Sequence, residues 1–120
     1  VVAATYPRHV GSSGIVVRAA ALGRPILGSD FGWIGRMVDW FALGRTVNCH
    51  DVSAIAASIA PSLEQATDYQ PSEAAKRFSA FHTVENFSAC WSAALRNQLG
   101  MPVPEQLRTW EWVKEAAAPR

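Results

Sequence analysis

The sequence is poor in charge and in cysteine. Charged side chains make up 18% of its 120 residues, the formal net charge is +1, and no run of lysine and arginine occurs. This balance disfavours nucleic acid as a partner. The two cysteines, Cys49 and Cys90, lie in no CxxC or CxxH pair, so no metal site is expected. Isolated cysteines are typical of a reduced, cytoplasmic protein.

Several sequence signals are missing as well. No stretch approaches the ~18 uninterrupted apolar residues of a membrane span, and no basic segment precedes an apolar leader. Association of a longer protein with a membrane surface is left open. The GxGxxG fingerprint, the Walker phosphate loop and the GxSxG motif are all absent, and no nucleophile–base pair is evident. We therefore assign no catalytic residue and expect no bound cofactor.

The composition of the sequence is that of a globular protein. Hydrophobic residues make up 49% and aromatic residues 10%, which is enough for one domain with a core. The chain opens without Met, inside the apolar run Val1 to Tyr6. We interpret Val1 as a cut point and expect an N-terminal domain of the same chain as a partner. Such a fragment is expected to expose apolar surface and to self-associate.

The first half alternates between short apolar strands and helices. Strands are expected at 1–6, 25–28 and 46–48, and strands joined through helices must lie parallel. The sequence therefore predicts an α/β fold, a partial Rossmann-like three-stranded parallel sheet with helices against both faces. The residues expected to begin or end the intervening helices are Gly23, Gly44, Asp51 and Pro61, the last by a kink or an end near Ala60.

Periodicity also predicts which helix faces are buried. Two apolar stripes are expected to face the core of the first half: Trp33, Met37, Trp40 and Phe41, and then Val52, Ile55, Ile59 and Leu63.

The second half is predicted to be helical. A helix is expected from Ser72 to about Phe81, and a second one from Thr83 to Gly100. The residues expected inward on the second are Phe87, Cys90, Trp91, Ala94 and Leu95. Pro104 is expected to begin a last helix with Leu107, Trp110 and Val113 inward and Trp112 exposed. We divide the chain into a Rossmann-like ligand-binding part, residues 1–98, and a helical tail, residues 99–120.

The candidate site lies in the two loops at the carboxyl edge of this sheet, where such folds bind ligands. Residues Gly11, Ser12, Ser13 and Gly14 follow a strand and open a helix. Backbone amides, two hydroxyls and the helix dipole suit a diphosphate there. Alternatively, Gly11 makes the turn and a serine caps the helix.

Four further residues are candidate contacts of the same ligand: His9, Arg18, Asp30 and Gly32. Each also has a plainer interpretation. His9 can be an ordinary loop histidine, Arg18 can extend to the surface, and Asp30 can cap the helix that follows it.

The stretch from Tyr6 to Leu63 resembles the C-terminal domain of glycosyltransferase family 4, retaining enzymes of the GT-B fold. The matching elements run in order over about the first 98 residues. They are the glycine-rich loop after a strand, Ala21-Leu22-Gly23-Arg24-Pro25, Ser29-Asp30-Phe31-Gly32, Gly44, Thr46 to Asn48, Asp51 to Ile59, and Phe81 with Phe87. The segment His9-x-Gly11-Ser12-Ser13 is also similar to the His-x-Gly loop of plant-type inverting glycosyltransferases, which contacts donor phosphates. Whether the sugar would be transferred with retention or inversion of its anomeric configuration is left open.

The resemblance implies a glycosyltransferase of the hexosyltransferase type that uses a nucleotide-sugar as donor substrate and needs no metal. It also shows departures. The family carries glutamates where this chain has Val10 and Arg18, and a third acidic residue where it has Arg36. Neither valine nor arginine can accept a hydrogen bond as a carboxylate does. The alternative is a catalytically inactive GT-B-like binding or scaffold module, which donor turnover would distinguish. A third alternative, a receiver domain, needs clustered acidic residues at the ends of its strands, and Asp30 is the only acidic residue here at such a position.

Overall fold

The computed structural model describes residues 1–108. The chain forms two compact units, one of residues 1–79 and one that begins at Ala80. Each is described by itself. The predictions made for Trp110, Trp112 and Val113 lie outside the described residues. The predicted division into 1–98 and 99–120 stays a prediction.

A three-stranded parallel sheet forms the centre of the first unit. Strands β1 (Val2–Ala4), β2 (Ile26–Ser29) and β3 (Gly44–Val47) lie in the order β1-β2-β3. All four residues of β2 are buried, as expected for a central strand covered on both faces. The predicted parallel arrangement is confirmed, although β1 ends at Ala4 rather than Tyr6.

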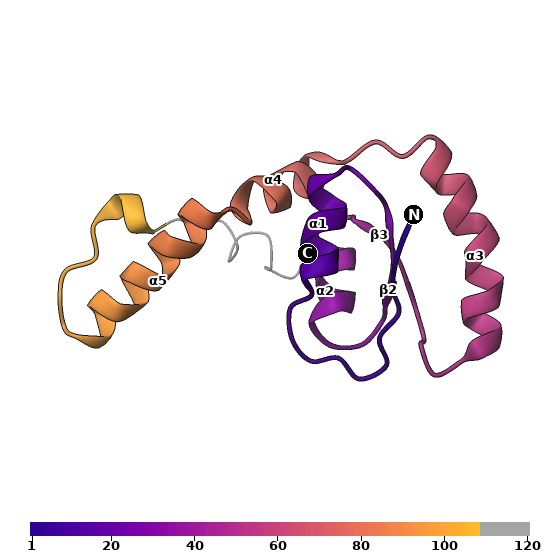
Figure 1. Ribbon diagram of the computed structural model, residues 1–120, viewed down its shortest axis with the longest axis horizontal. Helices are drawn as coiled ribbons and strands as arrows, with labels where there is room; N and C mark the ends of the chain where they lie inside the picture. Colours follow the sequence, from indigo (N-terminus) through magenta and orange to yellow (C-terminus); the bar gives the residue numbers. More distant parts are fainter. Residues whose placement is uncertain (109–120) are drawn as a thin grey trace. The chain divides into compact units, whose positions relative to one another are not determined.

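Helices cover both faces of this sheet. α1 (Gly14–Ala21) contacts β1 and β2, α2 (Gly32–Trp40) contacts β2 and β3, and α3 (Val52–Thr67) contacts β3 and β2. Figure 1 shows α1 and α2 on one side of the strands and α3 on the other. The buried residues between these layers include Ala4, Val16, Ala19, Ile26, Leu27, Ile34, Val38, Leu43 and Val47. The predicted α/β, partial Rossmann-like class is thus confirmed.

The predicted buried stripe of α2 is displaced by one position. Ile34 and Val38, together with Phe41 after the helix, are the buried residues, whereas Trp33 and Trp40 are partly exposed. The two tryptophans instead pack edge to face, with ring centroids 5.8 Å apart. The prediction is confirmed for Phe41 and was wrong for Trp33 and Trp40, because bulky rings can cover a neighbouring surface while smaller branched side chains enter the core.

α3 also faces the sheet differently from the prediction. Val52, Ile59 and Leu63 are all at least half exposed, and the buried residue of this helix is Ser62. The serine hydroxyls on this side of α3 hydrogen-bond to carbonyls of the same helix. Ser58 Oγ donates to the Ala54 carbonyl at 2.7 Å, and Ser62 Oγ donates to the Ser58 carbonyl at 2.6 Å. Small side chains thus lie on the buried side of α3, whereas Val52, Ile59 and Leu63 turn away from it and Ile55 is half-buried.

The structure settles where the first-unit helices begin and end. Asp51 caps α3 by accepting from the Ala54 amide at 3.0 Å, as predicted. Gly23 follows α1 with φ +61°, also as predicted. After α2 the left-handed residue is Ala42, with φ +50°, whereas Gly44 belongs to β3 and lies too close to Ile26 to hold a Cβ. The role predicted for Gly44 as the helix stop was therefore wrong.

Pro61 neither ends α3 nor lies near its end. The helix continues through Pro61 to Thr67. Proline has no N–H, so the hydrogen bond to the carbonyl four residues earlier is missing at this turn. The residues on either side nevertheless remain helical, and the predicted end near Ala60 was wrong.

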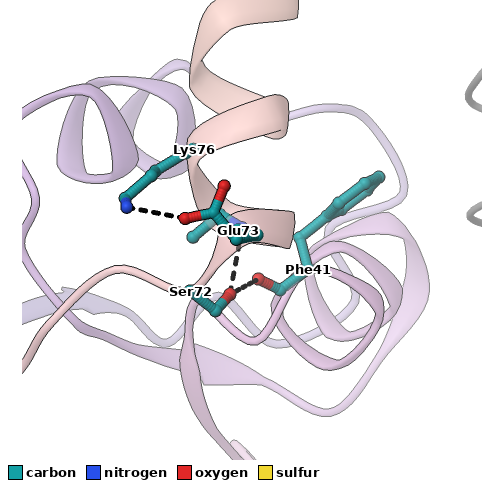
Figure 2. A network of polar contacts seen from close by, with 5 residues as sticks. Phe41, Ser72, Glu73 and Lys76 are labelled. Carbon is teal, nitrogen blue, oxygen red and sulfur yellow. Dashed lines mark hydrogen bonds and ion pairs between the residues drawn. The ribbon is translucent and has the colours of Figure 1, made fainter.

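α4 (Glu73–Phe81) begins on a short polar network (Figure 2). Ser72 Oγ accepts from the Ala75 amide at 3.1 Å and donates to the Phe41 carbonyl at 3.4 Å. Ser72 thus caps the helix, which begins next to the predicted start, and ties it to the end of α2. Lys76 Nζ donates to Glu73 Oε1 at 2.7 Å, and this bond lowers the pKa of Glu73. Phe78 is buried against Phe41, with ring centroids 5.0 Å apart.

Among residues 80–108, the second unit contains α5 (Val84–Gln98) and the 3₁₀ turn η1 (Glu105–Leu107), which contacts it. Thr83 caps α5 by accepting from the Asn86 amide at 3.2 Å, as predicted. Of the residues predicted to face inward, Phe87, Trp91, Ala94 and Leu95 are exposed and Cys90 is half-buried, whereas the fully buried residue of α5 is Ala93. Pro104 precedes a 3₁₀ turn over residues 105–107 rather than an α-helix there. No helix within residues 1–108 is long and apolar enough to cross a membrane.

Candidate functional site

Two loops and two helix starts meet at the carboxyl edge of the parallel sheet. The segment after β1 leads into α1 at Gly14, and the short turn after β2 leads into α2 at Gly32. Because β1 and β2 are adjacent and parallel, both connections begin at the same edge. This is the place where the sequence put the candidate site.

The two loops touch through their backbones. Gly32 has φ +65°, and a Cβ placed on it would lie 2.6 Å from the His9 carbonyl oxygen. A Cβ on Gly35 would lie equally close, at 2.6 Å, to the Asp30 carbonyl oxygen. Only glycine fits at either position. The structure therefore brings together His9 and Gly32, two residues that the sequence had singled out separately.

Neither helix start is capped by a side chain. Ser13 precedes α1 and Phe31 precedes α2, both in extended conformation, and neither makes a side-chain cap hydrogen bond. No acidic residue lies in the first turn of either helix. The first-turn amides thus keep their capacity to donate, and two positive helix-dipole ends adjoin one edge.

These observations correct two of the plainer interpretations. Ser13 stands at the cap position but its hydroxyl does not cap α1. Asp30 does not cap α2 either. Phe31 stands at the cap position, the Ser29 hydroxyl accepts from the Phe31 amide at 3.2 Å in the turn before the helix, and Asp30 is exposed. Ser29 is almost fully buried, where a carboxylate would lose its hydration without an ionic partner.

His9 organises the glycine loop. Its Nε2 lies 3.5 Å from the Ser12 carbonyl oxygen, and its ring is 5.7 Å from that of Tyr6. A Cβ on Gly11 would meet His9 Nε2 at an ordinary 3.6 Å. The imidazole therefore folds over Gly11 and helps to close the turn. At Gly14, by contrast, a Cβ would meet nothing within 4 Å, so the approach to the first turn of α1 is open.

Two arginines repeat the same position on the two helices. Arg18 is four residues after Gly14, and Arg36 is four residues after Gly32, and both are exposed. A residue four positions on lies on the same helix face, about one turn higher, and helical side chains lean back toward the N-terminus. The sequence treated these arginines as unrelated departures from a family pattern. Their equal spacing from the two helix starts was a signal that could have linked them.

A separate cleft of about 570 Å³ lies at the amino edge of the sheet, away from the candidate site. It is lined by residues that the sequence did not single out: Ala42, Arg45, Pro61, Glu64, Gln65, Asp68, Tyr69, Gln70 and Ser72. Several of these groups are already engaged. Arg45 Nε donates to Gln65 Oε1 at 3.1 Å, and the Tyr69 hydroxyl donates to the Ala42 carbonyl at 3.3 Å. Burial raises the pKa of Tyr69.

Residues 1–108 contain no group of three or more His, Cys, Asp or Glu side chains that could hold a metal ion. Comparison of the chain with protein-family models, with curated proteins and with solved structures finds no match.

Proposed function

We propose that the first unit binds the diphosphate of a nucleotide-sugar, as part of the donor site of a glycosyltransferase. The observation that carries the proposal is the pair of uncapped helix starts, α1 and α2, at one edge of the parallel sheet. Backbone amides at helix starts are suited to phosphate oxygens, since the amides point outward and the dipole favours negative charge.

The surrounding groups fit the same ligand. Ser12 and Ser13 offer hydroxyls beside the first turn of α1, and the space above Gly14 is open. Arg18 and Arg36 supply positive charge one turn further along each helix. When the sugar–phosphate bond breaks, charge builds up on the leaving diphosphate, and fixed amide and guanidinium donors stabilise that charge. This chemistry needs no metal ion.

The resemblance to glycosyltransferase family 4 narrows the ligand from any phosphate to a nucleotide-sugar. His9 positions the loop rather than serving as the acid or base, because its ring is turned onto Gly11 and Ser12. Val10 is exposed where the family has a glutamate and can neither accept nor donate a proton. The chain thus contributes leaving-group stabilisation, and the catalytic residues stay unassigned.

A second candidate function is a binding or scaffold module without turnover. It is favoured by Val10, Arg18 and Arg36, which replace all three acidic positions of the family. Both candidates bind the nucleotide-sugar, and they differ in one respect only. Release of UDP or GDP from the donor by the full-length protein identifies the enzyme, and tight donor binding without release identifies the module.

The binding site is tested by replacing Ser13 with aspartate. Aspartate is a good helix cap, so Ser13→Asp should satisfy the first-turn amides of α1 and leave stability unchanged or raise it by about 1 kcal/mol. The same carboxylate would occupy the position proposed for the diphosphate and would repel that anion. We expect the affinity for UDP or GDP, measured by calorimetry, to fall at least about tenfold.

The control is Thr83→Asp, which makes the same exchange at the cap of α5 and should not change nucleotide affinity. Equal affinity of Ser13→Asp and the unsubstituted chain, or no nucleotide binding at millimolar concentration, would rule out the proposed site.

A further inference from the structure

The cleft at the amino edge of the sheet lies within the first unit and has no part in the proposed nucleotide site. Its volume of about 570 Å³ is that of a site for a small molecule. Three charged residues line it: Arg45 on β3, Glu64 on α3, and Asp68 directly after α3. All three side chains are exposed, so a ligand in the cleft can reach them.

Gln65 orients the cation of the cleft. Arg45 Nε donates to Gln65 Oε1 at 3.1 Å, a bond that joins β3 to α3. Among residues 1–108, the two terminal nitrogens of this guanidinium have no hydrogen-bond partner. A guanidinium with both terminal nitrogens available is suited to a carboxylate, which it binds through two parallel hydrogen bonds.

Negative charge gathers at the end of α3. Glu64 and Asp68 are four residues apart, so helical geometry sets them near one face, one turn apart. The negative end of the helix dipole adds to their charge, and no basic residue lies in the last turn of α3. In the described part of the chain no ion pair joins either carboxylate to a cation, although Arg45 lines the same cleft. Like charges at this spacing repel each other, and a cation from outside would relieve the repulsion.

The last turn of α3 also lacks backbone partners. After α1, α2 and α5, the N–H of the residue that follows the helix donates to one of its last carbonyls. Over residues 1–108, no such bond runs from Asp68 to α3. The carbonyls of residues 64–67 therefore keep their capacity to accept hydrogen bonds at the end of the helix that borders the cleft.

We propose that this cleft binds a basic α-amino acid, a small molecule with one carboxylate and two cationic groups. The carboxylate binds the Arg45 guanidinium, and the cationic groups bind Glu64, Asp68 and the open carbonyls of α3. The ring of Tyr69 forms a side wall, fixed by its hydroxyl, which donates to the Ala42 carbonyl at 3.3 Å. Such a ligand meets each charge of the cleft with an opposite one. This proposal is independent of nucleotide-sugar binding, which we propose for the opposite edge of the sheet.

The test is calorimetric titration of the whole chain, at constant ionic strength, with L-arginine and with three analogues that each lack one of its charges. Agmatine lacks the carboxylate, Nα-acetyl-L-arginine lacks the α-ammonium group, and L-citrulline lacks the cationic side chain. We expect L-arginine to bind at millimolar concentration or below. Each analogue should bind at least about fivefold more weakly, because it leaves one charge of the cleft unmatched.

Arg45→Gln tests which group holds the carboxylate. It should weaken L-arginine binding at least about fivefold and leave agmatine binding unchanged, because agmatine has no carboxylate for Arg45 to bind. Arg36→Gln makes the same exchange at the other edge of the sheet and should leave L-arginine binding unchanged. UDP separates the two proposals, since its affinity should fall in Arg36→Gln and not in Arg45→Gln.

Three results would overturn the amino-acid site. The first is no binding of L-arginine at millimolar concentration. The second is an analogue that binds as tightly as L-arginine, which would show that one of the three charges is not recognised. The third is an Arg45→Gln variant that binds L-arginine as tightly as the unsubstituted chain does, or that loses agmatine and L-arginine equally.

Discussion

Glycine suits two positions at the candidate site, Gly32 and Gly14, for different physical reasons. Gly32 is required by the protein itself, because its φ is +65° and its missing Cβ makes room for the His9 carbonyl. Gly14 has no such neighbour, and it begins a helix, where alanine is the better residue. Its small size matters for what approaches from outside. Gly32 is therefore a structural glycine, whereas an approaching ligand would explain the glycine at position 14.

Substitution by alanine should act in opposite directions at these two positions. Gly32→Ala should lower the free energy of unfolding by at least about 2 kcal/mol, since it adds left-handed strain and a clash with backbone. Gly14→Ala should leave it unchanged or raise it by up to about 1 kcal/mol. Urea unfolding of both variants measures this. A Gly32→Ala variant as stable as the unsubstituted chain would mean that the His9 loop does not rest on α2.

Single residues also show what the sequence could not predict. Asp51 and Thr83 were predicted as caps and are caps, because their partners are amides three residues away in the chain. Asp30 was predicted as a cap on the same grounds, yet Phe31 stands at the cap position of α2 and no side chain caps this helix. The residue at which α2 begins is set by how the turn after β2 packs rather than by local sequence.

At the scale of elements, the order of strands and helices could be predicted, but the direction of several helix faces could not. Periodicity finds an apolar arc on α3 and on α5 and does not say what covers it. On α3 most of the arc is exposed, and the buried side instead holds the small side chains of Ala54, Ser58 and Ser62. The assumption that the most apolar face is the buried face failed for both helices.

The proline inside α3 gives an element-scale prediction. Pro61 removes one hydrogen bond from an otherwise continuous helix, and Pro61→Ala would restore it. We expect the variant to be about 1–3 kcal/mol more stable, the helical gain being partly offset by the freer unfolded chain. Thermal and urea unfolding measure the change. A less stable variant would show instead that the half-buried proline ring contributes more by packing than it costs the helix.

At the scale of the whole molecule, the parallel sheet followed from the alternation of strands and helices, and the candidate edge followed from the sheet. The sequence therefore predicted where the Gly11–Gly14 loop would lie. It could not predict that Gly32 would come against His9, or that α1 and α2 would both begin uncapped beside each other. Those features arise from two segments distant in the chain, and only the fold brings them together.

The central claim is that the starts of α1 and α2 hold a diphosphate, and amide chemical shifts test it most directly. In a titration of the ¹⁵N-labelled chain with UDP, the account predicts the largest shift changes at Gly14, Ile15, Gly32 and Trp33. Inorganic pyrophosphate should move the same amides, and Ser13→Asp should suppress both effects. Changes confined to the amino-edge cleft around Arg45 and Tyr69, or no change at any of the four amides at millimolar UDP, would contradict it.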